Sequence, residues 1–131
     1  MNPKREEFEV EGQMVPISHY AAAVRAGDLL FVSGCVPVDA QGDLVGGGDV
    51  VAQASRVFAN IGEVLAAAGA GPEDVVKVTL FLTDVDDRPA INGIRQEFFG
   101  QTRPASTLVE VSRLATPGAR IEVEAVAVLP T

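Results

Sequence analysis

Two glutamates near the end of the chain have the spacing best suited to acid–base chemistry. Glu122 and Glu124 alternate with Ile121, Val123 and Ala125, and successive side chains of a β-strand point to opposite faces. Both carboxyl groups are therefore predicted on one face of a strand. A carboxyl group in a partly desolvated cleft has a raised pKa, and it can both accept and deliver a proton. The same alternation also fits a solvated strand face, so spacing alone leaves both interpretations open.

The only tyrosine and the only histidine of the chain are neighbours. The phenol of Tyr20 can orient a substrate or a water molecule by hydrogen bonding. Histidine is a common proton shuttle, and His19 could serve as one beside Tyr20. Either residue could instead be an ordinary interface or packing side chain. A lone histidine is a poor basis for a metal site, so we expect no metal and no other cofactor.

Charge and composition disfavour several classes of function. The formal net charge is -8, and an acidic surface repels nucleic-acid phosphates and anionic membranes. No stretch approaches the roughly 20 apolar residues of a membrane span, and the charged first residues lack the apolar core of a secretory signal. We expect a small-molecule partner, no nucleic acid, no membrane and a cytoplasmic location. The single cysteine, Cys35, cannot form an internal disulfide, and we expect it to serve packing.

The length of 131 residues fits a single domain that spans residues 1–131, with 1–16 as an extended lead-in. Phe8 and Val10 alternate with charges there and permit a short edge strand. Five further strands and two helices are predicted from periodicity, caps and turns. The strands cover residues 20–25, 29–33, 75–82, 107–111 and 119–129. The helices run from a cap at Asp49 to about residue 68, and from about Asp87 to Gly100.

The order β-β-α-β-α-β-β predicts an α+β fold in which two helices cover one face of a sheet. The strands are rich in Val and Ala, which makes a fully solvated second face unfavourable. We therefore expect copies of the chain to pack through the uncovered face of the sheet.

Five segments, in the right order and spacing, resemble the RidA/YjgF family of enamine and imine deaminases. They are ISHYAAAV (17–24), LLFVSGCVPVD (29–39), VVKVTLFLTD (75–84), RPASTLVEV (103–111) and IEVEAVA (121–127). Any one segment is a weak signal, but together they extend over almost the whole chain. The resemblance implies a chorismate-mutase-like fold with a curved mixed sheet. It also implies a homotrimer with clefts between subunits, in which enamines and imines are hydrolysed to keto acids and ammonia.

The resemblance also assigns roles to individual residues. Glu122 matches the family glutamate that handles the hydrolytic water, and Tyr20 matches a tyrosine of the cleft. Gly34 and Asn92 match positions that shape the cleft. His19 departs from the family pattern, which has proline at this position.

Ser106 is the main departure from the family. The motif there contains an arginine that pairs with the substrate carboxylate, but this chain reads Pro104, Ala105, Ser106, Thr107. A guanidinium binds a carboxylate through two parallel hydrogen bonds, whereas a serine hydroxyl carries no charge. Ser106 and Thr107 could still contact a substrate, and Arg103 could supply the missing charge.

Two functions remain open from the sequence. The first is a hydrolase of C–N bonds with Glu122 and Tyr20 as catalytic residues, acting on an enamine or imine other than the standard 2-imino acids. The alternative is a trimer of the same fold that binds a small molecule without turnover.

Overall fold

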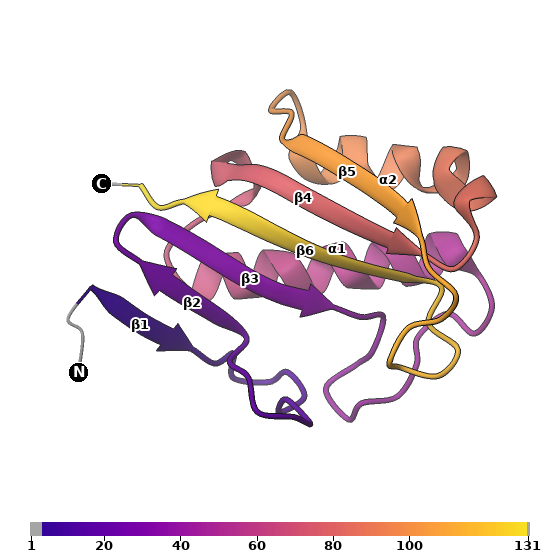
Figure 1. Cartoon of the computed structure of the whole chain (residues 1–131), viewed down its shortest axis with the longest axis horizontal. Coiled ribbons are helices and arrows are strands. Elements are labelled where there is room, and N and C mark those ends of the chain that lie inside the picture. Colours follow the sequence, from indigo (N-terminus) through magenta and orange to yellow (C-terminus); the bar gives the residue numbers. More distant parts are fainter. Residues whose placement is uncertain (1–3, 131) are drawn as a thin grey trace.

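The six strands form one sheet in the order β1-β2-β3-β6-β4-β5 (Figure 1). The structure, a computed structural model, describes residues 4–130. Two helices and two short 3-10 turns connect the strands. The strands are β1 (Arg5–Phe8), β2 (Ala23–Ala26), β3 (Leu29–Cys35), β4 (Val75–Leu82), β5 (Ala105–Glu110) and β6 (Ile121–Val128). The helices are α1 (Val50–Ala67) and α2 (Arg88–Phe99).

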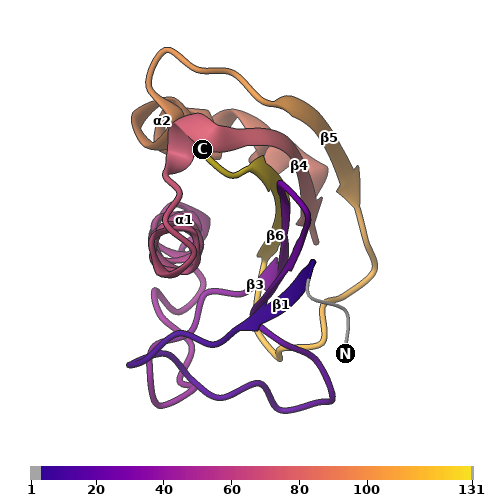
Figure 2. The same cartoon turned by 90° about the vertical axis from the view of Figure 1, so that its left-hand side faces the viewer.

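The sheet is mixed and curved, and both helices lie on its inner side (Figure 2). All neighbouring strands are antiparallel except β4 and β5, which are parallel. Parallel strands need a crossover connection, and α2 provides it. The predicted α+β architecture, with two helices on one face of a mixed sheet, is confirmed.

Local sequence explains where the helices begin and end. Asp49 caps α1, because its Oδ1 accepts hydrogen bonds from the backbone N–H groups of Val51 and Ala52. Gly69 follows this helix in the left-handed conformation, with φ of 78°. Gly100 also has a positive φ, of 64°, and it ends α2 with its backbone N–H donating to the carbonyl oxygen of Gln96. The core lies between the helices and the inner face of the sheet, where Phe58, Leu30 and Val123 are almost fully buried.

The outer face of the sheet has no helix over it and exposes apolar side chains. Phe31 is 45% exposed, Val128 is 42% exposed and Leu29 is 39% exposed, on the adjacent strands β3 and β6. Such a continuous apolar surface is typical of an interface with another chain.

Several of the predicted strand boundaries differ from the structure. The first hairpin strand begins at Ala23 rather than residue 20, and β5 begins at Ala105 rather than 107. The last strand is confined to Ile121–Val128. The edge strand permitted by the lead-in is present as β1, displaced to Arg5–Phe8 and paired with β2. These ends are set by pairing with neighbouring strands, which local propensity does not encode.

Candidate functional site

Glu122 lies on the outer face of β6, directly against Gly34. A Cβ atom built on Gly34 would overlap Oε2 of the Glu122 carboxylate. Gly34 belongs to an irregular stretch of β3, where the pairing with β6 shifts between Val32 and Cys35. The absence of a side chain at Gly34 therefore allows the carboxylate to lie close to the backbone, and a side chain there would displace it.

The pKa of the Glu122 carboxyl is raised above the usual glutamate value. The first cause is burial, because the side chain is only partly solvated, and the second is the negative charge of Glu124. Glu124 itself is exposed on the same face. A carboxyl group with a raised pKa is protonated over a wider pH range. It can therefore act as a base in one step and as an acid in the next.

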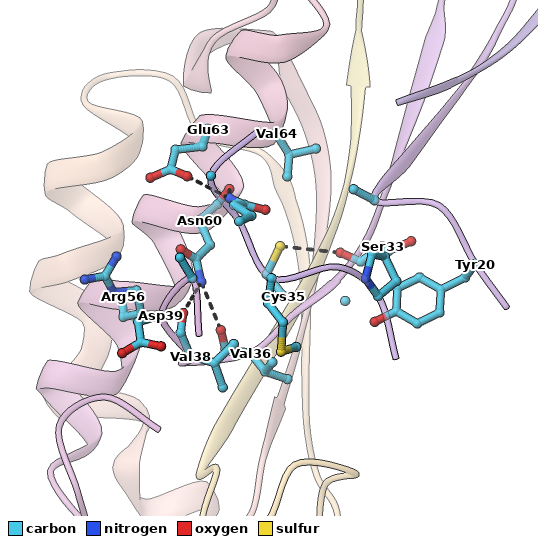
Figure 3. A pocket seen from close by; sticks show the side chains of 17 residues that line it. Tyr20, Ser33, Cys35, Val36, Val38, Asp39, Arg56, Asn60, Glu63 and Val64 are labelled. Atoms are coloured by element: carbon cyan, nitrogen blue, oxygen red, sulfur yellow. Dashed lines mark hydrogen bonds between the residues drawn. The ribbon is translucent and has the colours of Figure 1, made fainter. Parts of the chain in front are cut away.

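A cavity of about 150 Å³ lies beside Gly34, between the end of β3, helix α1 and the segment before β2 (Figure 3). Tyr20, Ser33, Gly34 and Cys35 line it from one side. Helix α1 adds Arg56, Asn60 and Glu63. Gly34 thus borders both this cavity and Glu122.

Hydrogen bonds hold the walls of this cavity. The Asn60 side-chain amide donates to the carbonyl oxygens of Val36 and Val38, at 3.2 and 3.1 Å. Ser33 Oγ donates to the carbonyl oxygen of Ala21 at 2.6 Å, and Cys35 Sγ donates to that of Ser33 at 3.6 Å. Burial and the charge of Glu122 raise the pKa of the Cys35 thiol to about 12. The thiol is therefore protonated and unreactive near neutral pH.

Tyr20 and His19 lie at the exposed rim. Tyr20 is 48% exposed and lines both the cavity and a neighbouring hollow beside β1 and β2. His19 lines only the hollow, and its side chain makes no hydrogen bond within residues 4–130.

Ser106 lies on the opposite face of the sheet from Glu122. It pairs with Val78, whose side chain is buried under the helices, and paired residues of adjacent strands share a face. Arg95 of α2 donates a hydrogen bond from Nη2 to Ser106 Oγ at 2.8 Å. Asn92 is exposed one turn earlier on the same helix.

Thr107 and Arg103 do not join Ser106. The Thr107 side chain lies on the outer face, where Lys77 Nζ donates to its Oγ1 at 2.7 Å. Arg103 is exposed in the loop before β5 and makes no hydrogen bond with any residue that the structure describes. The hypothesis that Arg103 supplies the charge of the family arginine thus has no support in a contact within the described residues. Sequence reasoning missed Arg95, which does contact Ser106.

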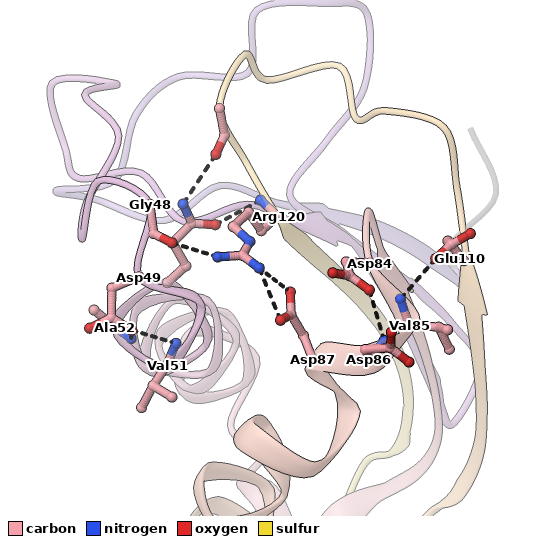
Figure 4. Close-up of polar contacts among 12 residues, drawn as sticks. Gly48, Asp49, Val51, Ala52, Asp84, Val85, Asp86, Asp87, Glu110 and Arg120 are labelled. Atoms are coloured by element: carbon pink, nitrogen blue, oxygen red, sulfur yellow. Dashed lines mark hydrogen bonds and ion pairs between the residues drawn. The ribbon is translucent and has the colours of Figure 1, made fainter.

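Arg120 anchors the start of the strand that carries Glu122 (Figure 4). Its Nη2 donates to both oxygens of Asp87, at 2.9 and 2.7 Å, and its Nη1 donates to the carbonyl oxygen of Gly48 at 2.6 Å. The Arg120 backbone N–H donates to Oε1 of the buried Gln53 at 2.7 Å. These bonds link the start of β6 to the starts of both helices. The guanidinium of Arg120 is thus already bonded to other residues of the fold.

Within one chain, the candidate residues therefore form two separate groups. Glu122, Gly34 and Tyr20 lie around the outer face and the end of β3. Ser106, with Arg95 and Asn92, lies beside α2. Glu122 pairs with Phe81, which pairs with Val109 on β5. The two groups are thus two strands apart and on opposite faces.

The residues that the structure describes form neither a metal cluster nor a membrane-spanning helix. They contain no group of three or more His, Cys, Asp or Glu side chains arranged to hold a metal ion. None of their helices has both the length and the apolar character to cross a membrane.

Comparison with known families identifies the chain. The family described as Endoribonuclease L-PSP matches residues 11–129. The chain belongs to this family. It is the family also known as RidA/YjgF, so the resemblance of the five segments is confirmed.

Several relatives of the Endoribonuclease L-PSP family match over most of their length. A RutC family protein of Pyrococcus abyssi is 42% identical over 112 residues, which cover 86% of this chain and 87% of the relative. A protein named 3-aminoacrylate deaminase RutC, from Acinetobacter baylyi, is 39% identical over 117 residues, covering 89% and 92%. A protein named 2-iminobutanoate/2-iminopropanoate deaminase, from Capra hircus, is 40% identical over 113 residues, covering 86% and 81%.

Solved structures agree with the family fold. The yeast protein YEO7 superposes with a TM-score of 0.91 at 30% identity, covering 96% of this chain and 99% of the yeast chain. The YjgF gene product of E. coli superposes with a TM-score of 0.86 at 33% identity, covering 94% and 98%. The curved sheet with two helices is therefore the RidA/YjgF fold.

Proposed function

We propose that this chain is a deaminase that hydrolyses an enamine or imine of a reactive nitrogen-containing metabolite. Imine and enamine deaminases occur in its family, as the names of the relatives from Acinetobacter baylyi and Capra hircus state. The observation that carries the proposal is Glu122, a half-buried carboxyl group with a raised pKa that lies against Gly34. No metal or other cofactor is required for this hydrolysis.

The proposed reaction needs one group to move protons twice. An enamine first takes a proton on carbon and becomes an iminium ion, and an imine reaches the same state by protonation on nitrogen. Glu122 takes a proton from water as the oxygen bonds to the iminium carbon, which gives a carbinolamine. The protonated carboxyl group then delivers its proton to the nitrogen. As the C–N bond breaks, the hydroxyl oxygen returns its proton to the Glu122 carboxylate, and ammonia and a carbonyl compound are released. Tyr20 orients the substrate or the water, with Gly34 shaping the wall and His19 at the rim.

We propose that the active cleft forms between subunits of a homotrimer. The separation of Glu122 from Ser106 and Asn92 within one chain supports a cleft shared by two subunits. The uncovered apolar surface around Phe31 and Val128 supports burial of the outer face by partner chains. Nucleic acid is an unfavourable partner for a chain with a net charge of -8. The cytoplasm is the proposed compartment.

The proposed substrate differs from the small 2-imino acids. Ser106, at the position of the family arginine, offers a hydroxyl and no charge of its own. That same observation supports the second candidate function, a trimer that binds a metabolite without turnover. Under the second function a ligand stabilises the protein against heat, but no product forms.

The test is ammonia release from a panel of imines and enamines generated in the assay by amino-acid oxidases and lyases. We expect the wild type to accelerate release from at least one of them and Glu122→Gln to lose about 100-fold or more of that rate. The oligomeric state of both proteins, measured by sedimentation, serves as the control for folding. Equal rates for the two proteins would remove Glu122 from the mechanism. Ligand-induced stabilisation with no acceleration for any substrate would favour the binding function.

A further inference from the structure

Arg95 brings a guanidinium group to the position where the family arginine is missing. The arginine lies on α2, and its Nη2 donates a hydrogen bond of 2.8 Å to Ser106 Oγ on β5. A serine can accept this bond, whereas an arginine at position 106 would place a second positive charge against the first. Ser106 therefore leaves room for the guanidinium of Arg95. The charge of Arg95 takes the place of the charge that the family arginine would carry.

Arg95 lacks an anionic partner within residues 4–130. Arg95 takes no part in the ion pairs Arg5–Glu7 and Arg120–Asp87. The bond to Ser106 is the only hydrogen bond of the Arg95 side chain there. A guanidinium group carries five N–H donors in a planar fork, so most of the donors of Arg95 remain available.

The environment of Arg95 favours an anion. The residue is only partly exposed, and burial lowers the pKa of its guanidinium, although an arginine stays charged at neutral pH. A charge that is partly removed from water is costly until an opposite charge pairs with it. Asn92 lies one turn earlier on α2, within side-chain reach on the helix surface, and adds an amide donor.

We propose that Arg95, held in position by Ser106, binds the carboxylate of the substrate. That the ligand is a substrate rests on the proposed function. The binding of a carboxylate can be measured without turnover. It narrows the substrate class to enamines and imines that bear a carboxylate. The substrate then differs from a 2-imino acid in where its carboxylate lies, on the α2 side of β5, rather than in lacking one.

The test is calorimetric titration at low ionic strength with two keto acids of the same size, 2-oxobutanoate and freshly prepared 3-oxobutanoate, and with their methyl esters. These acids resemble the products and differ in the distance between the carbonyl and the carboxylate. We expect the wild type to bind at least one acid. In Arg95→Gln the affinity for that acid should fall by about 10-fold or more, while the affinity for its neutral ester stays the same. The affinity of Arg95→Lys for the acid should lie between those of the wild type and Arg95→Gln, because a lysine keeps the charge but loses the planar fork.

Three further variants isolate the contact. Arg88→Gln, which removes an exposed arginine from the start of the same helix, should leave binding unchanged. Ser106→Ala should weaken binding of the acid less than Arg95→Gln, because the charge remains but its position is no longer fixed. The double substitution Arg95→Gln with Ser106→Arg should recover affinity for 2-oxobutanoate, because it restores the arrangement that the family motif implies.

The outcomes separate this proposal from the deaminase function. Loss of binding in Arg103→Gln rather than Arg95→Gln would overturn the assignment, as would failure of the wild type to bind either acid. If the wild type and Arg95→Gln release ammonia from carboxylate substrates at equal rates, the deaminase function is supported but Arg95 does not bind the substrate carboxylate. Arg95-dependent binding without ammonia release would support the anchor and remove the deaminase function.

Discussion

Gly34 and Glu122 are in such close contact across β3 and β6 that no side chain fits between them. The contact joins an irregular strand end to the proposed acid–base group, and Gly34 also lines the cavity to which Tyr20 contributes. The carboxylate position therefore depends on the absence of a Cβ atom at residue 34.

Gly34→Ala should lower the deaminase rate by about 10-fold or more, because the added methyl group displaces the Glu122 carboxylate. The effect should fall on kcat more than on KM, since the carboxylate acts on water rather than holding the substrate. Steady-state kinetics with the best substrate of the panel checks this. Gly93→Ala is the matched control, because a Cβ atom there meets nothing within 4 Å. An unchanged kcat in Gly34→Ala would mean that the contact has no role in catalysis.

The raised pKa of Glu122 predicts how stability depends on pH. The folded protein holds this proton to a higher pH than the unfolded chain, whose glutamate has its ordinary pKa. As pH rises from that ordinary value through the raised folded value, the unfolded state releases the proton first and folding becomes less favourable. The contribution of Glu122 to stability is therefore fully present at low pH and lost above the folded pKa.

Glu122→Gln should accordingly be more stable than the wild type at pH 7, and the difference should shrink as pH falls below the ordinary glutamate value. Thermal unfolding of both proteins across this pH range checks the sign. A variant that is less stable than the wild type at pH 7 would contradict the cause given for the shift, which is burial first and Glu124 second.

The elements of the fold were largely predictable, because hydrophobic periodicity and caps are local. The helix capped by Asp49 and the strand at 75–82 agree with the structure, as does the short connection between the predicted strands 20–25 and 29–33. The parallel pairing of β4 with β5 depends on the path of α2 across the sheet. No local pattern in residues 105–110 encodes that path.

The site was less predictable, because its contacts are tertiary. The face shared by Glu122 and Glu124 follows from alternation along one strand. The bond between Arg95 and Ser106 depends on the rotation of α2 about its axis and on the register of β5. The signal that could have pointed to it was an arginine on the exposed side of the second predicted helix, where the sequence offered no reason to prefer it over Arg103.

Arg120 should be important for stability, because it connects the start of β6 to Asp87 and Gly48. Arg120→Met removes these bonds and leaves the mostly buried Asp87 carboxylate without its cation, at a cost of about 1–3 kcal/mol. Asp87→Asn should cost less, because the amide oxygen still accepts a hydrogen bond. Denaturant unfolding measures both. Arg113→Met, at an exposed position, is the control and should change little. Equal effects at residues 113 and 120 would mean that the network contributes nothing measurable.

Phe31→Glu should prevent assembly of the proposed homotrimer. Phe31 is 45% exposed on the outer face of β3, between Val24 and Val126 on the adjacent strands. A charge buried against a partner subunit without a counter-ion is strongly unfavourable, whereas the same charge on a solvated monomer costs little. We expect a smaller species by sedimentation equilibrium and a loss of deaminase activity, because the cleft requires two chains. Val51→Glu on α1, where the apolar side chain is 39% exposed but lies away from the sheet, should keep both the assembly and the activity. A trimer that persists in Phe31→Glu would move the interface away from this part of the outer face.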